Sequence, residues 1–335
     1  MSFPKFTTKV LTGLALGACV VCALPSDAGT NCESIYRLTE KASYQEGCFP
    51  PCMCPIMMAT GIRGTFVMGP ATAGDTFISH EVLYVNWIVT LDDAEFEITG
   101  SGTYQVSNGP QPWVHSLDLN LSVDGGETQH FFSGFVPLTS NDGSVDIPIS
   151  IKGQYCYDTV IVVNASPVTQ DSILHFRLAP DSTYQRGCFD PCDCPLEMPR
   201  RLHGAFTLVP VLEHGTYVEY AVSSARFFVP PFNNVSEEIR LTGFGTYTLV
   251  QGFAGPAHQL DLRLRTSCGE FERFGNALVN TDPSFPAEID IVVDKNHQIC
   301  LDTVLSIHAI WSGPIVFRDG FECGGRAAWS SSNGP

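Results

Sequence analysis

Cysteine is the residue type whose spacing in this sequence could most directly do chemistry. The chain contains 13 cysteines, and eight of them fall into two matching sets of four. Each set has a C-x3-C-x-C group followed much later by a single cysteine; the sets are Cys48, Cys52, Cys54 and Cys156, and Cys188, Cys192, Cys194 and Cys300. Four thiols at such spacing can form two disulfides or hold zinc or copper(I) as thiolates.

Two disulfides within each set are the simpler interpretation for an exported chain, and we expect no bound metal or other cofactor. A bond between Cys52 and Cys54 would be strained because one residue separates them. Two connectivities remain open, and in both of them the C-x3-C-x-C group is tied to Cys156. We predict that the two sets do not cross-link with each other.

Apart from Cys19 and Cys22, which lie in the apolar run near the N-terminus, three cysteines have no counterpart in this duplication. They are Cys32, Cys268 and Cys323. One bridge plus one free thiol, or an intermolecular bridge, would account for them.

Two further pairs of residues occupy matching places and could act chemically. His115 and His258 begin matching apolar runs and could bind a ligand, but we interpret them as partly solvated residues at a strand edge. Asp158 and Asp302 follow the last cysteine of each set and could bind calcium or act as a general base. We interpret them as turn-forming aspartates.

No motif of a known catalytic or nucleotide-binding site occurs in the sequence: G-x-S-x-G, H-E-x-x-H, the P-loop and the EF-hand loop are all missing. The acidic run Asp92, Asp93, Glu95 and Glu97 has no equally dense counterpart near Glu237, so we interpret it as a solvated loop. We assign no catalytic residue and favour a non-enzymatic protein.

The elements that position the cysteines are duplicated as well. Residues 36–55 match residues 176–195 at eleven of twenty positions without a gap. We therefore expect a first module over residues 29–166, a linker over 167–172 and a second module over 173–312.

Both modules show the two-residue alternation of β-strands. Residues 96–106 place apolar side chains and two glycines on one face, and residues 239–249 repeat this pattern. Two glycines on an apolar face indicate a bend or a close backbone approach. Ile147, Ile149 and Ile151 supply a later strand, with residues 289–293 as the expected counterpart. We predict an all-β chain of two antiparallel modules, and favour an up-and-down barrel over a sandwich.

The N-terminus has the features of an export signal. Lys5 and Lys9 precede an apolar run over residues 10–24, and small residues end at Ala28, so we expect a signal peptide over residues 1–28. An alternative is lipid attachment at Cys19, because residues 16–19 form an imperfect lipobox. We expect a secreted or extracellular protein, with a periplasmic or lipid-anchored one as the alternative and no transmembrane segment.

The C-terminal tail, residues 313–335, contains F-R-D-G-F-E-C-G followed by Trp329 and Ser330. It resembles the F-x-D-G-F-E-x-G-x4-W-S ending of many exported bacterial proteins, although Cys323 departs from that pattern. The tandem modules resemble uncharacterised cysteine-containing repeats of secreted bacterial proteins. The resemblance implies export from a bacterial cell and implies no particular activity.

The net charge of the chain limits the classes of partner that it could bind. The chain has 18 Lys plus Arg against 35 Asp plus Glu, so an electrostatic grip on nucleic acid is unfavourable. We expect a secreted structural or binding protein that presents loops to an extracellular protein. The alternatives are a carrier of a small apolar ligand, and a metal-binding or hydrolytic protein that uses the cysteine groups or the duplicated aspartates.

Overall fold

The structure is a computed structural model of the 335-residue chain. It describes residues 33–55, 58–91, 94–107, 109, 112–140, 142–231, 237–253, 255–266, 269–281 and 285–313. The predicted signal peptide, the lipobox, Cys32, Cys268 and the tail beyond Gly313 lie outside these ranges. The described chain is all-β, as predicted, apart from the short 3-10 helix η1 (Gln170–Ser172).

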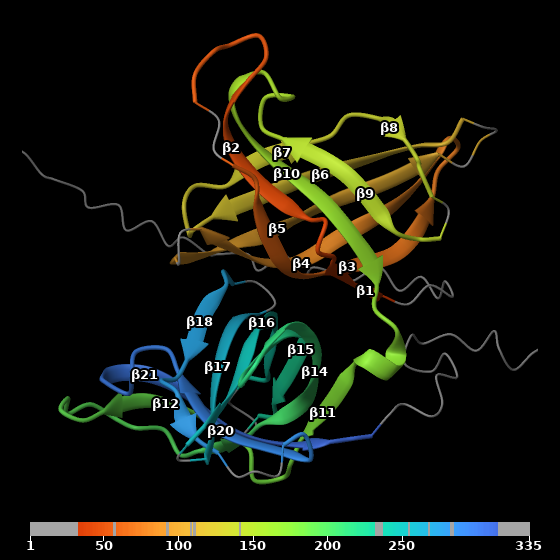
Figure 1. Ribbon diagram of the computed structural model, residues 1–335. Coiled ribbons are helices and arrows are strands. Elements are labelled where there is room, and N and C mark those ends of the chain that lie inside the picture. Colours follow the sequence, from red (N-terminus) through yellow and green to blue (C-terminus); the bar gives the residue numbers. More distant parts are fainter. Residues whose placement is uncertain are drawn as a thin grey trace, which may run out of the picture.

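The first module is one antiparallel sheet of ten strands, coloured red to yellow-green in Figure 1. Its strands are β1 (Ser34–Leu38), β2 (Ser43–Phe49), β3 (Thr60–Ala73), β4 (Phe77–Leu91), β5 (Ala94–Ser107), β6 (Val114–Val123), β7 (Gln129–Phe132), β8 (Val136–Pro137), β9 (Val145–Ser150) and β10 (Cys156–Pro167).

The second module repeats this architecture with eleven strands. They are β11 (Leu174–Leu178), β12 (Thr183–Phe189), β13 (Arg200–Arg201), β14 (His203–His214), β15 (Tyr217–Val229), β16 (Ile239–Gly252), β17 (Gly255–Thr266), β18 (Glu272–Gly275), β19 (Val279–Asn280), β20 (Glu288–Asp294) and β21 (Cys300–Trp311). The predicted tandem of two similar β modules is therefore present.

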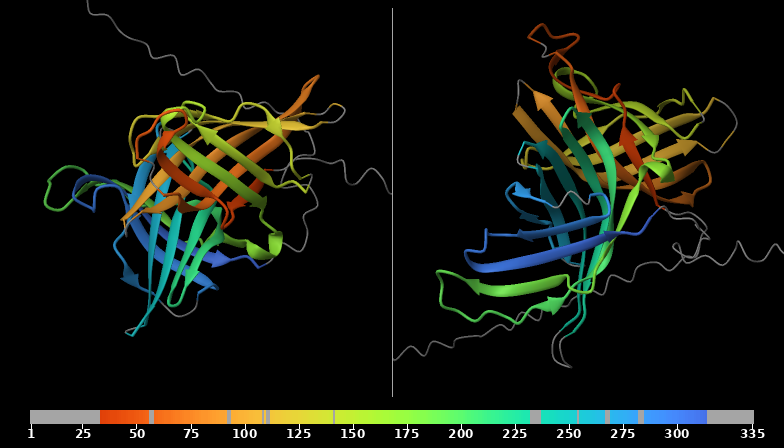
Figure 2. Two further views of the ribbon diagram at one scale, coloured as in Figure 1. Left: turned by 45° about the horizontal axis from the view of Figure 1, so that its top comes forward. Right: turned by 60° about the horizontal axis from the view of Figure 1, so that its bottom comes forward.

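Each sheet curls strongly around its own interior, as Figures 1 and 2 show. The long strands β3 to β6 form a meander, and β1 pairs with both β3 and β10. The prediction of an up-and-down barrel is wrong in one respect, because neither sheet closes into a barrel. β7 meets β9 at one residue pair, Phe132 with Ser150, and β18 meets β20 at Gly275 with Asp294.

Alternation along the strands gives each module a separate apolar core. Trp87, Leu119 and Ile149 are among the fully buried side chains of the first core, and Tyr247 and Leu262 belong to the second. No residue is shared between the two clusters. Each module therefore removes its own large apolar surface from water, which is the main favourable term in folding.

The paired glycines on the apolar face allow two strands to approach closely, as the sequence suggested. A Cβ atom at Gly100 or Gly102 would collide with the main chain of β6, and one at Gly243 or Gly245 with that of β17. The glycines pair with leucines of β6 and β17, so the close approach occurs where these strands carry the leucine rows of the two cores.

The register of the closing strands corrects one predicted correspondence. Ile147 pairs with Val163 in β10, and Ile291 pairs with Ile307 in β21. The residues of β9 and β20 therefore correspond at an offset of 144, so that Ile147 matches Ile291 rather than Ile289. The sequence-based alignment was two residues out because alternating isoleucines look the same after a shift of two.

Candidate functional site: the cleft between the modules

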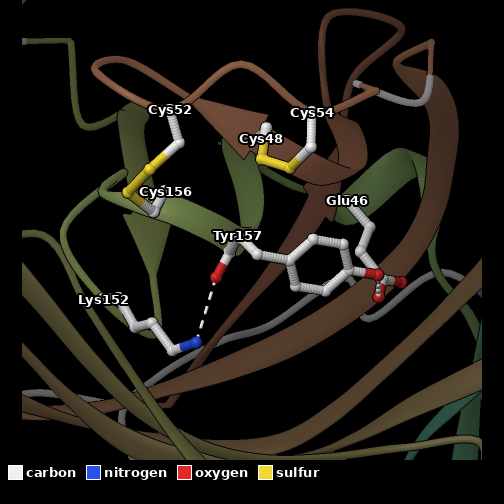
Figure 3. Close-up of a disulfide and its surroundings, with 7 residues drawn as sticks. All are labelled: Glu46, Cys48, Cys52, Cys54, Lys152, Cys156 and Tyr157. Atoms are coloured by element: carbon white, nitrogen blue, oxygen red, sulfur yellow. Dashed lines mark hydrogen bonds between the residues drawn. A yellow bond between two sulfur atoms is a disulfide. The ribbon is translucent and has the colours of Figure 1, made fainter.

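Two disulfides lie close together in each module, and Figure 3 shows those of the first module. In the first module Cys48 bonds to Cys54 and Cys52 to Cys156, with Cα atoms 5.2 and 4.9 Å apart. The second module repeats this arrangement with Cys188–Cys194 and Cys192–Cys300. This is one of the two connectivities left open above, and it commits all eight sulfur atoms to bonds within a module. Thiolate ligation of a metal by these cysteines would require those bonds to be reduced.

The duplicated aspartates hold the loops that lead into the second disulfide of each module. The buried Asp158 carboxylate accepts main-chain hydrogen bonds from Ile151, Lys152, Gln154 and Thr159 at 2.8–3.2 Å. The Asp302 carboxylate is bonded in the same way by four main-chain N–H groups. The interpretation as turn-forming residues is confirmed, because the carboxylates are consumed by the loop backbone.

The duplicated histidines differ from the expectation of partly solvated strand-edge residues. His115 and His258 are each only 1% exposed. The Nδ1 atom of each lies 3.1 Å from a buried tyrosine hydroxyl, that of Tyr104 or Tyr247. Nε2 of each has no hydrogen-bond partner. They lie inside because they continue the inward-facing leucine rows of β6 and β17, where the ring of each packs edge-on against the buried tyrosine.

Burial lowers the pKa of both His115 and His258. Each imidazole therefore takes up a proton less readily in the folded state than in the unfolded state, where its ordinary pKa is about 6.5. The stability they contribute is present above that pKa and lost as the pH falls through it. We therefore expect the free energy of unfolding, measured in urea, to fall between about pH 7 and pH 5, and His115→Gln with His258→Gln to flatten the fall.

His308 supplies a control of opposite sign. Its hydrogen bond to Asp181, and then that to Glu288, raises its pKa. Its contribution is present at low pH and is lost as the pH rises through its folded-state pKa. His308→Gln should therefore make the acid-side loss steeper. An unchanged pH slope in the double variant of the buried histidines would refute the account.

The two modules also contact each other through the outer faces of their sheets. Strands β3 and β4 pack on β14, β15 and β16. Val67 and Ile88 are buried there although they lie on the outer face of the first sheet, and Val209, Ala221 and Phe244 are buried on the outer face of the second. Residues on an outer face lose solvent only when something covers that face, and here the other module covers it.

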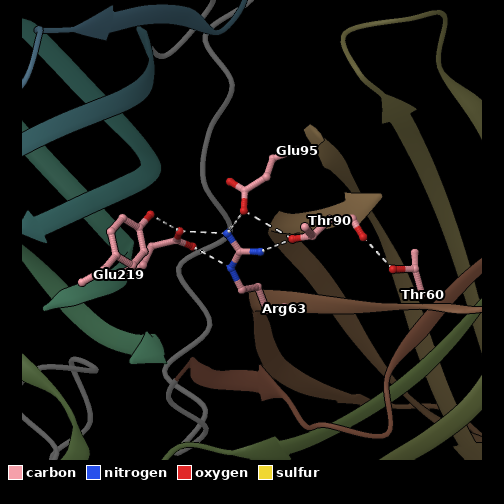
Figure 4. A network of polar contacts seen from close by, with 6 residues as sticks. Thr60, Arg63, Thr90, Glu95 and Glu219 are labelled. Carbon is pink, nitrogen blue, oxygen red and sulfur yellow. Dashed lines mark hydrogen bonds and ion pairs between the residues drawn. The ribbon is translucent and has the colours of Figure 1, made fainter. Parts of the chain in front are cut away.

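Arg63 of β3 is the central residue of this interface (Figure 4). Its Nε and Nη2 donate to the Glu219 carboxylate of the second module at 3.2 and 3.0 Å. Nη2 also donates to Glu95 at 2.8 Å, and Nη1 to the Thr90 hydroxyl at 2.9 Å. Glu219 is 2% exposed and accepts a further bond from the Tyr217 hydroxyl at 2.9 Å. A planar guanidinium suits this forked contact with a carboxylate.

Further polar contacts cross the same interface. The Asn86 side-chain amide donates to the carbonyl oxygen of Gly245 at 2.8 Å. The hydroxyl groups of Thr65 and Ser223 lie 3.3 Å apart, and Arg263 of β17 pairs with Glu97 of β5. Asn86, Thr65 and Ser223 are buried, so their hydrogen bonds fix the relative position of the modules.

A cleft of about 550 Å³ opens beside these contacts and is lined by both modules. The first module contributes Ile88, Glu95, Phe96, Glu97, Asp124 and Gly125, and the second Tyr217, Glu219, Thr246, Thr248, Gln259, Asp261, Arg263 and Arg273. Its volume lies within the range of small-molecule sites, about 300–1,000 Å³. Carboxylates outnumber guanidinium groups along its walls.

Two groups in the cleft are perturbed by their surroundings. Burial, followed by the neighbouring Glu219 carboxylate, raises the pKa of Tyr217 to about 12. Burial also raises the pKa of Asp261, against the opposing effect of its ion pair with Arg273. Tyr217 therefore stays a hydrogen-bond donor at every physiological pH.

Sequence reasoning missed this site and misread one part of it. Glu95 and Glu97 were interpreted as a solvated loop, but they pair with Arg63 and Arg263. Asp92 and Asp93 lie outside the described residues. The residues of the cleft were not found because they are not duplicated: Ser79 stands in the first module where Glu219 stands in the second. Only a search for charged residues that break the repeat could have singled them out.

Comparison of the chain with protein-family models, curated proteins and solved structures found no match. Within the described ranges, no helix has the length and apolar character needed to cross a membrane. The same part of the chain contains no cluster of three or more histidine, cysteine or acidic residues arranged to hold a metal ion.

Proposed function

We propose that this protein is a secreted, non-enzymatic binding protein whose ligand occupies the cleft between the modules. The observation that carries the proposal is that both modules line one cleft and that the Arg63–Glu219 ion pair holds them together beside it. The cleft between the modules has room for a ligand, whereas apolar side chains fill the interior of each module. The bound ligand would therefore contact both copies of the repeat at once.

The ion pairs in the cleft support binding rather than acid–base catalysis. Glu95 and Glu219 share Arg63, and Asp261 pairs with Arg273. A carboxylate that a guanidinium group holds by hydrogen bonds has a fixed position and has part of its accepting capacity occupied. Such fixed groups can orient a polar ligand.

The lining predicts the chemical class of the ligand. Five carboxylates and two guanidinium groups face the cleft, and the chain as a whole carries a formal charge of -17. An anionic ligand would be repelled, whereas a cationic or hydroxylated one would find acceptors. Tyr217 and Phe96 add aromatic surface, and the Gln259 amide adds a donor and an acceptor.

The disulfides and the sequence of the N-terminus support export. Four disulfides in a chain of this size are typical of an oxidising compartment outside the cytosol. The apolar run over residues 10–24 and the resemblance of the tail to bacterial export endings point the same way.

Calorimetric titration with three probes tests the proposal: spermine as a cation, maltotriose as a neutral polyol and citrate as an anion. We expect heat of binding for spermine or maltotriose and none for citrate. Gln259→Trp places an indole in the cleft and should abolish binding. Thr103→Trp adds the same group at an exposed site on β5 away from the cleft and should leave binding unchanged.

Two results would contradict the proposal. One is the absence of binding by both spermine and maltotriose. The other is binding that survives Gln259→Trp, since the ligand would then lie elsewhere on the molecule.

A further inference from the structure

One wall of the cleft is a polar patch on the outer face of the second sheet. Thr246 and Thr248 of β16 alternate with residues of the apolar core, so their side chains point away from that core and line the cleft. Thr248 pairs with Gln259 of β17 and with Glu219 of β15. Thr246 pairs with Asp261 of β17. Because directly opposed residues of neighbouring strands share a face of the sheet, these side chains form one continuous surface.

Most of the negative charge around this polar patch is already paired. Four of the five carboxylates that line the cleft are in ion pairs with arginine: Glu95 and Glu219 with Arg63, Glu97 with Arg263, and Asp261 with Arg273. A cationic ligand would have to compete with these guanidinium groups. Displacing Arg63, whose side chain is 15% exposed, would leave a largely buried charge without its partner, which is unfavourable. The cleft is therefore a poorer site for a cation than its number of carboxylates indicates.

Hydroxyl groups of a ligand can use the same side chains without breaking an ion pair. A hydroxyl group both donates and accepts hydrogen bonds, and a carboxylate offers about four lone-pair sites, so a carboxylate bound to arginine can still accept a bond from a hydroxyl. Thr246, Thr248 and Gln259 each supply a donor and an acceptor and carry no charge. Tyr217 and Phe96 also line the cleft, and their rings supply apolar surface for the carbon-bound hydrogens of a sugar ring.

We propose that the ligand of the cleft is a neutral oligosaccharide and not a polyamine, an inference that rests on the proposed function of the cleft. Thr246, Thr248 and Gln259 bond its hydroxyl groups from the outer face of β16 and β17. Asp261 accepts a further hydroxyl bond while Arg273 holds it in place. Few well-placed polar groups beside aromatic surface are what fixes the orientation of a small ligand.

The first module supplies a matched control for this polar patch. Thr103 of β5 pairs with Asp118 of β6 as Thr246 of β16 pairs with Asp261 of β17. The threonine and aspartate of the first module lie outside the lining of the cleft. Thr246→Val and Thr103→Val therefore make the same change in the same local setting, with and without the cleft. Valine has nearly the shape of threonine and favours strands, so both variants should fold.

Calorimetric titration of the full chain with maltotriose and with spermine tests the inference. We expect maltotriose to bind in preference to spermine. Its dissociation constant should change by less than about twofold between about 0.05 and 0.5 M NaCl, because a neutral ligand has no charge for salt to screen. Thr246→Val should raise the dissociation constant about three- to tenfold, the effect of one lost hydrogen bond, and Thr103→Val should leave it unchanged.

The outcomes separate this inference from the proposed function. Binding of spermine in preference to maltotriose would overturn the oligosaccharide and leave a ligand in the cleft. Equal affinities of the Thr246→Val and Thr103→Val variants for maltotriose would also overturn it, since the sugar would then not contact the polar patch. If neither probe bound, the proposed function would fail, and the oligosaccharide with it.

Discussion

Replacing Glu219 by alanine is expected to lower the free energy of unfolding by about 3–5 kcal/mol, because it leaves a buried guanidinium without its main partner. The Arg63 side chain is 15% exposed and that of Glu219 is 2% exposed. Arg63 would retain Glu95 and the Thr90 hydroxyl, but the Glu95 carboxylate is half exposed. Urea unfolding followed by circular dichroism measures the loss.

The control for this substitution is an ion pair at the surface. Glu238 pairs with Arg240, and these side chains are 40% and 71% exposed. Solvent screens such a pair, so Glu238→Ala should change the free energy of unfolding by less than about 1 kcal/mol. Equal effects of Glu219→Ala and Glu238→Ala would show that Glu219 is not buried against Arg63.

Removal of the Cys52–Cys156 disulfide is the second change with a large expected effect. This bond closes a loop with a sequence separation of 104, whereas Cys48–Cys54 spans a separation of 6. In the chain-entropy model the longer loop is worth about 5 kcal/mol and the shorter about 2 kcal/mol. We expect paired serine substitutions, Cys52→Ser with Cys156→Ser, to lower stability by the larger amount in urea unfolding.

The second module offers a repeat of the same comparison. Cys192–Cys300 has a sequence separation of 108 and Cys188–Cys194 one of 6, so the same ratio of losses should recur. If the short and long bonds had equal effects, loop closure would not be the source of the stability. The loops held by Asp158 and Asp302 would then be the better explanation.

Features that occur in both modules could be predicted from the sequence alone. Two copies of the C-x3-C-x-C group identified the modules and the cysteine sets, since the same spacing recurs within two stretches that match at eleven of twenty positions. Alternation of apolar residues over 96–106 and 239–249 predicted the core faces of β5 and β16, because side chains of a strand point alternately to its two sides. Asp158 and Asp302 were correctly interpreted from their turn-forming chemistry.

Other features depend on contacts between residues distant in the sequence. Arg63 and Glu219 are 156 positions apart, and neither belongs to a motif. Burial of His115 depends on its place inside the curled sheet, where its ring packs on Tyr104 of β5, and periodicity does not reveal whether the start of a strand is covered. The failure of the sheets to close, with a single residue pair between β7 and β9 and between β18 and β20, was not predicted because alternation of apolar residues is the same in a paired and an unpaired edge.

The central claim is that the two modules contact each other through Arg63 and Glu219 and so form the cleft. A double-mutant cycle of Arg63→Ala and Glu219→Ala in the full chain measures that contact directly. The claim predicts a coupling free energy of at least about 1–3 kcal/mol, because each single change removes the same buried pair. Additive effects, with no coupling, would mean that the two residues do not touch, and the cleft would not exist in solution.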